Sequence, residues 1–590
     1  MSTAVQSLRA RWNALRARPP AGPRGLIWQP PPRAIGSVRV GRRIASGQFM
    51  LAGELVEGPD PWDLTPPTSA FEMQLHGMGW LDDLMAAAEA DTAPPPGAGA
   101  PRADPGAPSL ARYAARTWIE GWAARYGSGA GPGWTAALTG RRLLRWISHA
   151  PVLLGAMKAR DQQRVFDTMY AQAGFLRRHW AEAAPGLARV EALTGLLYAG
   201  LTLEGMAELQ LEATAALAEA AVEAADGGAT AARNPEALAE VALLLGWSVR
   251  ALREGPVVTP DGDDALVPPT LEMSTLRVGA ILRALRHADG TLARFHGGGG
   301  GQPERLAQAL ADAPDVPAPD AGQLSMGFAT LRRGGTSLIV DAAPPPTGPV
   351  SGSAGAATLA FEMTSRAGPV VVSCGPGAAF GPKWHRAGRA TASHSTLSLA
   401  GHSSSRIGPA LDHEGRQIAP LIQRPERVQW QRSRSRDGAD VVTLSHDGWV
   451  RSHGITHLRR LSLDRDGAAL RGEDALRAVR GVDRERLTDA MARGDGVAWD
   501  LRFHLHPDAE ARLDMGGRAV SIVLPGGEVW VLRPGGRIAS SLTIALTPSA
   551  YLDARRLHPR PSTQVVFSDR LVAYAATVDW TLSRAQASGR

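Results

Sequence analysis

Several histidines of this chain could act as acids or bases or bind a metal. They lie next to glycines or in segments with the alternating pattern of a β-strand. His296 precedes a five-glycine run at 297–301, and His394 lies in the segment RATASHSTL. Histidine titrates near neutral pH, so either ring could exchange a proton with a substrate. His504 and His506 are two residues apart in RFHLHP, so on a strand they would share a face and could chelate a metal. The glycine run lacks a following Gly-Lys-Ser/Thr, which argues against a phosphate-binding loop.

These candidates also have structural interpretations. A lone histidine such as His394 does not hold zinc, which needs three or four ligands, and its ring could instead satisfy backbone groups between strands. Arg389 could receive a carboxylate in a bidentate contact or form a salt bridge between sheets. Asn234 precedes Pro235 and is most simply a helix N-cap, whereas Arg233 could face a cavity.

Two further candidates lie in helical sequence, and one residue bears on redox chemistry. Trp247 could stack on a sugar ring, although a core position is the more common role of tryptophan in a helix. Glu191 is an acidic residue within an otherwise apolar helical run. Cys374 is the only cysteine, which excludes a disulfide framework, and its apolar surroundings PVVVSC favour a buried inert thiol.

The elements that must position these residues change character along the chain. From about residue 62 to 315, apolar residues recur at i, i+3, i+4 and i+7 in most segments, and several segments are apolar on more than one side, as in a helical bundle or toroid. From about 320 the period changes to two, with Gly, Asp and Pro turns. The segment GFATLRRGGTSLIVDA predicts a hairpin with Gly-Gly at its turn, and ATLAFEMT, SRAG and PVVVSC predict a second hairpin that follows SGSAGAA. We therefore predict an N-terminal extension with short strands (1–60), a helical domain (61–315) and an antiparallel β-sandwich (320–590).

Composition bounds the class of protein. A chain of 590 residues is too long for one hydrophobic core, and 44% hydrophobic with 21% charged residues is typical of a soluble globular protein. A net charge of +7 favours an anionic partner, but only two of the 64 basic residues are lysines, so the arginine excess could reflect genome composition. No membrane span or secretory signal is recognisable, so the sequence alone predicts a cytoplasmic protein.

Several segments together resemble the heparinase II/III-like proteins. They are PWDLTPPTSAFEMQLHGMGWLDDL, RRLLRWISHAPVLL, GTLARFHGGG, LIVDAAPPP, RATASHSTLSLAG, HDGWVRSHGITHLRRLSL, LRGEDAL and RFHLHPD, in collinear order over roughly residues 60 to 570. The resemblance implies an incomplete α/α toroid followed by an antiparallel β-sandwich, which agrees with the periodicity. It also implies a cell-envelope or periplasmic location.

The active members of this family are lyases that cleave uronic-acid polysaccharides, including glycosaminoglycans, by β-elimination. The proton removed lies α to a carboxylate, so its removal needs a base and a group that neutralises the carboxylate charge. Relatives supply an Asn-His pair and a Tyr from the toroid, and a His-Ala-His motif on the first β-hairpin. Some bind a metal through the second His of that motif, a residue at the hairpin end and one further His.

Aligned on this chain, most of those positions carry other residues. The Asn-His pair falls on Leu187 and Ala188, the Tyr near Ala237, and the hairpin-end ligand on Ser373. The His-Ala-His motif falls on residues 353–355, within SGSAGAA. The further His is the one that matches, as His394. The resemblance therefore implies that the family metal site is lost, and we expect no cofactor.

Two hypotheses of function remain open. The first is a lyase on an acidic polysaccharide that uses a non-standard site, with His296, Arg233 and His394 as catalytic residues and Arg389, Asn234, Trp247 and Glu191 as substrate-binding residues. The second is a catalytically degenerate protein of the same fold that binds glycan or associates with the cell envelope. For either we expect an acidic polysaccharide or oligosaccharide as partner, no nucleic acid and no membrane span. The glycan and the oligomeric state stay open.

Overall fold

The computed structural model of the protein describes residues 25–92, 109–226, 231–256, 267–314, 322–366, 368–413 and 416–585. The chain divides into two compact units. The first comprises Met1–Ala229, Leu238–Gly279 and Glu304–Val316, and the second comprises Thr230–Ala237, Ala280–Pro303 and Pro317–Arg590. The predicted boundary near residue 320 falls outside the described residues and stays a prediction.

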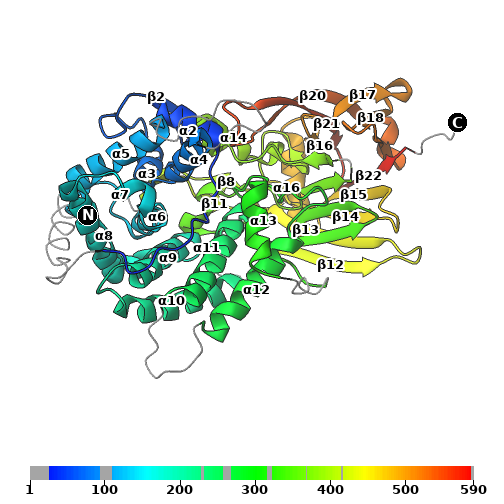
Figure 1. Ribbon diagram of the computed structural model, residues 1–590. Helices are drawn as coiled ribbons and strands as arrows, with labels where there is room; N and C mark the ends of the chain where they lie inside the picture. Colours follow the sequence, from blue (N-terminus) through cyan, green and yellow to red (C-terminus); the bar gives the residue numbers. More distant parts are fainter. Residues whose placement is uncertain are drawn as a thin grey trace. The chain divides into compact units, whose positions relative to one another are not determined.

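The first unit is helical, and its helices form an incomplete α/α toroid (Figure 1). A short antiparallel ribbon of β1 (Gln48–Leu51) and β2 (Glu54–Glu57) accompanies them. The helices are α2 (Val38–Ala45), α3 (Ser69–Gly77), α4 (Trp80–Thr92), α5 (Leu110–Tyr126), α6 (Ala136–Ser148), α7 (Ala150–Leu154), α8 (Ala159–His179), α9 (Leu187–Thr202), α10 (Glu208–Ala225), α11 (Pro235–Glu254), α12 (Pro269–Ala284) and α13 (Pro303–Ala311).

Packing in this unit rests on small residues and tryptophans. A Cβ added to Gly140 of α6 would lie 2.3 Å from the Glu191 carbonyl oxygen of α9, so only glycine permits this approach of the two helices. The indole rings of Trp62, Trp80 and Trp122 are buried in an aromatic cluster. None of the helices in the described ranges is long and apolar enough to span a membrane.

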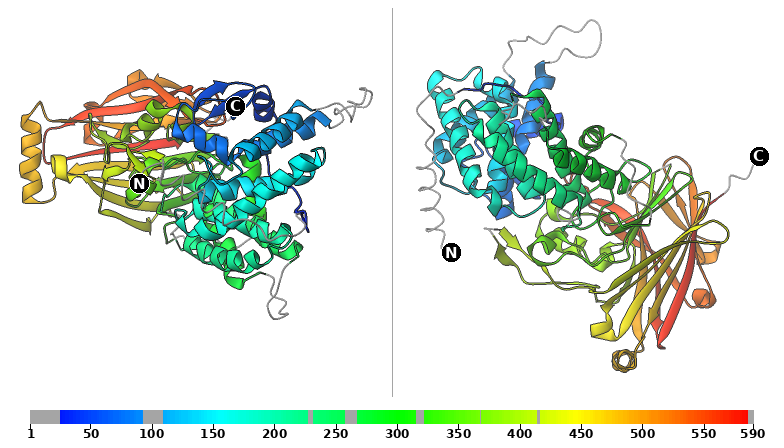
Figure 2. Two further views of the ribbon diagram at one scale, coloured as in Figure 1. Left: turned by 90° about the vertical axis from the view of Figure 1, so that its left-hand side faces the viewer. Right: turned by 90° about the horizontal axis from the view of Figure 1, so that it is seen from below.

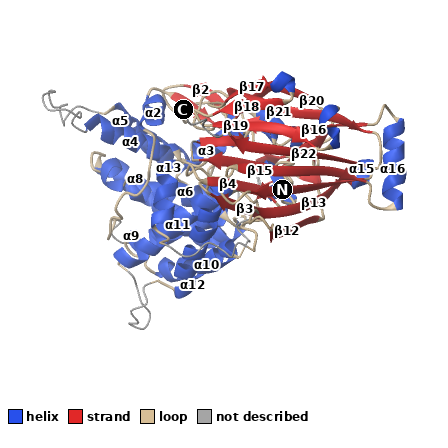
Figure 3. Ribbon diagram, turned by 90° about the vertical axis from the view of Figure 1, so that its right-hand side faces the viewer, coloured by secondary structure: helices blue, strands red, loops and turns tan. Residues whose placement is uncertain are grey.

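The second unit is a sandwich of two antiparallel sheets, seen from further sides in Figures 2 and 3. One sheet has the strand order β12-β13-β14-β15-β22-β19-β18-β17 and the other β20-β21-β16-β6-β5-β4-β3, with β7 paired to β16. The first sheet contains β12 (Val428–Arg434), β13 (Asp440–Trp449), β14 (Ile455–Leu463), β15 (Ala469–Arg477), β17 (Glu510–Asp514), β18 (Ala519–Val523), β19 (Val529–Gly535) and β22 (Ala575–Arg584). The second contains β3 (Phe328–Arg333), β4 (Thr336–Asp341), β5 (Phe361–Ser365), β6 (Gly368–Val372), β7 (Leu397–Leu399), β16 (Val497–Leu505), β20 (Thr543–Tyr551) and β21 (Arg560–Leu571).

Shorter elements complete this unit. They are the two-stranded ribbons β8 (Arg406–Ile407) with β11 (Leu421–Gln423) and β9 (Leu411–His413) with β10 (Arg416–Ile418), and the helices α14 (Pro382–Gly388), α15 (Val450–His453) and α16 (Gly481–Ala492). The predicted toroid followed by an antiparallel sandwich is confirmed.

Period-two patterning explains the sandwich core. In β14 buried and partly exposed residues alternate, so every second side chain enters the space between the sheets. Phe361, Trp499 and Trp580 meet there. The predicted hairpin in GFATLRRGGTSLIVDA is β3–β4, and its Gly334 and Gly335 have φ of 53° and 87°, a turn that glycine adopts without strain.

Candidate functional site

The hairpin β5–β6 forms where the sequence predicts it, and the positions aligned with the family metal site converge around His394. The Nδ1 atom of His394 lies 3.2 Å from the Ser373 hydroxyl at the end of the hairpin. A Cβ added to Gly355 would lie 2.7 Å from Nε2 of the same ring. The imidazole therefore occupies the space that a side chain at position 355 would need.

The donor set at this point does not fit a metal. It consists of one imidazole, one hydroxyl and a glycine, whereas zinc in proteins takes three or four nitrogen, sulfur or carboxylate ligands. Over the described ranges, no group of three or more His, Cys, Asp or Glu side chains is placed to hold a metal ion.

His394 is also a weak base. Burial lowers its pKa to about 3, and the neighbouring His296 and His504 rings act in the same direction. Its Nε2 atom has no hydrogen-bond partner among the described residues. At neutral pH the ring is therefore uncharged. A base whose conjugate acid has so low a pKa holds a proton only weakly, so it has little driving force to remove a weakly acidic proton from a substrate.

Arg233 and His296 meet at a buried aspartate, Asp341, at the end of β4. Arg233 pairs with Asp341 Oδ1 at 2.5 Å, and its other N–H groups donate to backbone carbonyls at 2.8–3.0 Å, those of Met326, Gly327, Ala343 and Pro344. His296 Nε2 lies 3.2 Å from Asp341 Oδ2, without hydrogen-bond geometry. All three side chains are buried, so the cluster holds loops together from the inside.

The charges of this cluster explain its titration. Burial alone would raise the pKa of Asp341, but Arg233 and His296 outweigh it and lower the pKa to about 2. Burial lowers the pKa of His296 despite the nearby carboxylate. Arg233 and His296 both have φ near 50°, a left-handed conformation that is strained for side chains of this size.

Arg389 holds the SGSAGAA segment in place. Its Nε donates to the Ala354 carbonyl at 2.8 Å, and its two terminal nitrogens donate to the carbonyls of Ala419 and Ser351 at 2.8 and 2.9 Å. Burial lowers its pKa to about 10, and Arg386 adds to this. Of the two roles that the sequence offered, the salt bridge is not formed with any described residue, and three backbone carbonyls accept the N–H groups instead.

The remaining candidates occupy structural positions. Asn234 Oδ1 accepts the backbone N–H groups of Glu236 and Ala237 at 3.0 and 3.1 Å, as an N-cap of α11 does. Trp247 is buried in the first unit, and Glu191 forms a bidentate salt bridge with Arg141 at 2.7 and 2.8 Å. His296, Arg233 and His394 belong to one unit, as do Arg389 and Asn234, while Trp247 and Glu191 belong to the other.

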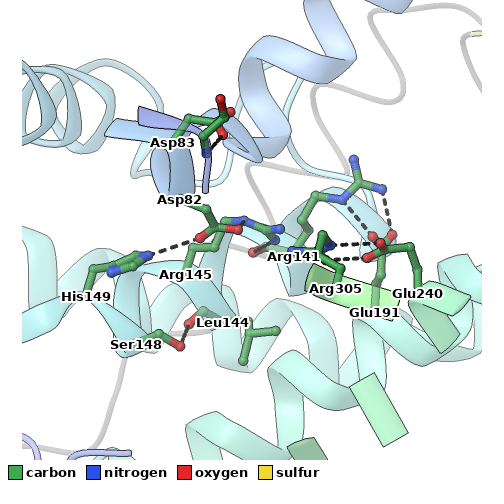
Figure 4. A network of polar contacts seen from close by, with 11 residues as sticks. Asp82, Asp83, Arg141, Leu144, Arg145, Ser148, His149, Glu191, Glu240 and Arg305 are labelled. Carbon is green, nitrogen blue, oxygen red and sulfur yellow. Dashed lines mark hydrogen bonds and ion pairs between the residues drawn. The ribbon is translucent and has the colours of Figure 1, made fainter. Parts of the chain in front are cut away.

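Glu191 is part of a wider charged network between helices of the first unit (Figure 4). Asp82 accepts from Arg145 at 2.9 Å and lies 3.0 Å from the His149 ring, and Arg305 pairs with Glu240. Of the residues in this network, only Glu191 was predicted as a candidate from the sequence. The signal in the sequence was the recurrence of acidic and basic residues within otherwise apolar helices. Charged side chains in a buried position need partners of opposite charge, so such residues predict ion pairs.

Two other predicted features proved to be buried. Cys374 Sγ lies 3.5 Å from His504 Nδ1, and although burial raises the pKa of this thiol, His504, Ser549 and Arg294 together outweigh burial and lower the pKa to about 7. His504 also contacts the Ala392 carbonyl at 2.8 Å, so it is not paired with His506 at a metal. Asp341 itself was missed; its only signal was an acidic residue ending the apolar run LIVD.

Comparisons with known proteins agree with this fold. A family model described as "Heparinase II/III-like, C-terminal" matches residues 315–581. FtsZ-localized protein C of Caulobacter vibrioides is 30% identical over 96% of this chain and 91% of its own length. Among solved structures, heparinase III matches with TM-score 0.60 and 11% identity over 89% of this chain and 78% of its own. A mutant of heparan sulfate lyase HepC from Pedobacter heparinus matches with TM-score 0.55 and 14% identity over 100% and 89%. The chain belongs to the heparinase II/III-like family.

Proposed function

We propose that this chain is a non-catalytic member of the family that associates with FtsZ instead of cleaving a polysaccharide. The observation that carries the proposal is the surroundings of His394. The positions aligned with the other family ligands are Ser373, which bonds to the ring, and Gly355, whose missing side chain leaves the space that the ring fills.

The chemistry of β-elimination supports this proposal. The reaction needs a base of suitable pKa next to a group that neutralises the substrate carboxylate. His394, with a pKa of about 3, is poorly suited as the base. The guanidinium groups of Arg233 and Arg389 are buried and hydrogen-bonded to backbone carbonyls, so neither is free to receive a carboxylate without breaking those bonds.

The name of a relative that matches both units of this chain supports FtsZ as the partner. FtsZ-localized protein C shares 30% identity over 91% of its length, so both units of this chain have a counterpart in it. The likeness to heparinase III, at 11% identity, is a likeness of fold. A shared fold does not indicate a shared substrate. Association with the FtsZ assembly is therefore the better supported function, and elimination of an acidic polysaccharide is the alternative.

The test is co-sedimentation with FtsZ of the same organism. FtsZ filaments assembled with GTP are pelleted with the purified chain, and we expect the chain in the pellet with GTP and in the supernatant when FtsZ is omitted or unassembled. His394→Ala should pellet as the natural chain does, because this side chain is buried and does not reach the surface that a partner would contact. A chain that stays in the supernatant at every FtsZ concentration would refute the association.

A glycan arm separates the alternatives. Heparan sulfate is offered to the same preparation, with heparinase III as a positive control for elimination. We expect no unsaturated product. Binding of the polysaccharide without turnover would support a glycan-binding role in place of the FtsZ association, and turnover lost in His394→Ala would support the lyase.

The compartment is also a proposal, since the cytoplasm and the periplasm remain the two expectations from sequence and family. An association with FtsZ requires the chain to share the compartment of FtsZ. A fluorescent fusion that follows FtsZ to the division site would support the association, and a diffuse signal in dividing cells would count against it.

A further inference from the structure

One margin of the sandwich differs from the other three. The strands at the ends of the two sheets are β12, β17, β3 and β20. The first three each carry charged residues, two arginines in VQWQRSR, three charges in EARLD and two arginines in FATLRR, whereas TIALTPSAY of β20 carries none over nine residues. Charges on edge strands oppose pairing with another chain, so β20 is the edge without that protection.

The outer side of β20 has no strand paired to it among the described residues, although residues of β17 in the other sheet lie close to β20. Strand β20 pairs with β21 through all nine of its residues, and no strand of the described ranges pairs with its other side. Ile544 and Leu546 point toward the sandwich core but are only partly buried, because the core ends at this margin. The outer backbone groups of β20 therefore lack a strand partner within the described ranges, and Ile544 and Leu546 stay partly exposed.

The sequence at this edge is symmetric in its chemistry. Thr543, Ile544, Ala545, Leu546 and Thr547 read the same from either end as hydroxyl, aliphatic, small, aliphatic, hydroxyl. The next residue is a proline, which cannot donate to a ladder and so limits the available run to these five positions. An antiparallel copy of the same run is therefore its natural complement.

We propose that β20 pairs antiparallel with β20 of a second copy of this chain, about a two-fold axis at Ala545. The axis sets Thr543 opposite Thr547, Ile544 opposite Leu546, and Ala545 opposite itself. Threonine pairs and aliphatic pairs are favourable across antiparallel strands, and the small Ala545 lies where two identical side chains meet. About a two-fold axis, residues near the axis lie close to their own symmetry mates, so a charge there would meet a like charge. The strand β20 carries no charged residue and avoids this repulsion.

The pairing joins the two second sheets into one continuous sheet and covers the exposed margin of both cores. This pairing needs no FtsZ and is measured on the purified chain alone, so either proposal can fail without the other.

Sedimentation of the purified full-length chain tests the assembly. We expect a species of twice the 62.2 kDa chain mass that dissociates on dilution. Ala545→Lys should sediment as a monomer, because two ammonium groups would meet at the axis. Gln431→Lys, the same new residue on the charged edge strand β12, should remain dimeric. A natural chain that is monomeric at every soluble concentration, or a dimer unaffected by Ala545→Lys, would overturn the proposal.

Cysteine cross-linking tests the register with variants that do not burden the fold. The Cα atoms of Ala545 and its mate would be about 4.5–5.5 Å apart, within the range for a disulfide, so Ala545→Cys should give a covalent dimer on mild oxidation. Thr543→Cys is the matched control: its symmetry mates are offset by four residues, about 13 Å along the strand, and should not cross-link.

Mixing Thr543→Cys with Thr547→Cys chains should restore the cross-link. The natural Cys374 is buried, and the natural chain measures its background. Two results would overturn the register and with it the proposed axis. One is cross-linking of Thr543→Cys alone as fast as that of Ala545→Cys, and the other is no cross-linking in the mixture of Thr543→Cys and Thr547→Cys chains.

Discussion

Substitution of Gly355 by alanine tests whether the imidazole of His394 fills the space of a lost ligand. The added Cβ would lie 2.7 Å from Nε2 and 3.1 Å from Cε1 of that ring, well inside contact distance. The φ of Gly355 does not lie in the left-handed region, so an alanine backbone is tolerated and the cost comes from the contact. Overpacking of a buried site costs about 1–3 kcal/mol, and we expect a loss of this size.

A double-mutant cycle separates this contact from other effects. In a His394→Ala background the ring is gone, so Gly355→Ala should cost about 0.5 kcal/mol or less, and the difference is the coupling energy. The assay is urea unfolding followed by tryptophan fluorescence, with Ala354→Gly as a neighbouring control that adds no atom. A Gly355→Ala cost that is equal in both backgrounds, or absent from the natural chain, would refute the close packing of ring and glycine.

Further predictions concern the buried charges. Arg233→Met should lower the unfolding free energy by about 3–5 kcal/mol, because it leaves Asp341 buried without its cation, and urea unfolding beside Arg386→Met measures the loss. His394, with a pKa of about 3, stays neutral while the unfolded chain takes up a proton, so stability should fall by about 1.4 kcal/mol per pH unit from pH 6.5 toward 3. His394→Gln should remove that part of the pH dependence. Asp341, whose pKa is lowered to about 2, gives stability that is full above its unfolded pKa of about 3.9 and is lost as the pH falls toward 2; Asp341→Asn should flatten acid unfolding there.

Much of the architecture could be predicted from sequence because periodicity reports burial. The change from a helical period to alternation located the two halves, and the Gly-Gly turn located the β3–β4 hairpin. The alignment of SGSAGAA with the family's His-Ala-His motif stays a prediction, although its short side chains alone indicate that the segment does not bind a metal.

The roles of individual polar residues could not be predicted in the same way. Arg389 and Arg233 are of the residue type that commonly binds carboxylates. Only the structure reveals that their N–H groups donate to backbone carbonyls. Asp341 brings Arg233 and His296 together from segments 108 and 45 positions away in sequence. Such long-range pairing leaves no local pattern, so a single sequence does not disclose it.

The most direct test of the central claim is the product formed from an acidic polysaccharide. The chain, at high concentration and over days, is incubated with heparan sulfate, and the unsaturated uronate is measured by its ultraviolet absorbance and by mass spectrometry. The account predicts no product above that of a boiled sample. Accumulation of unsaturated oligosaccharides that stops in the His394→Ala variant would contradict it.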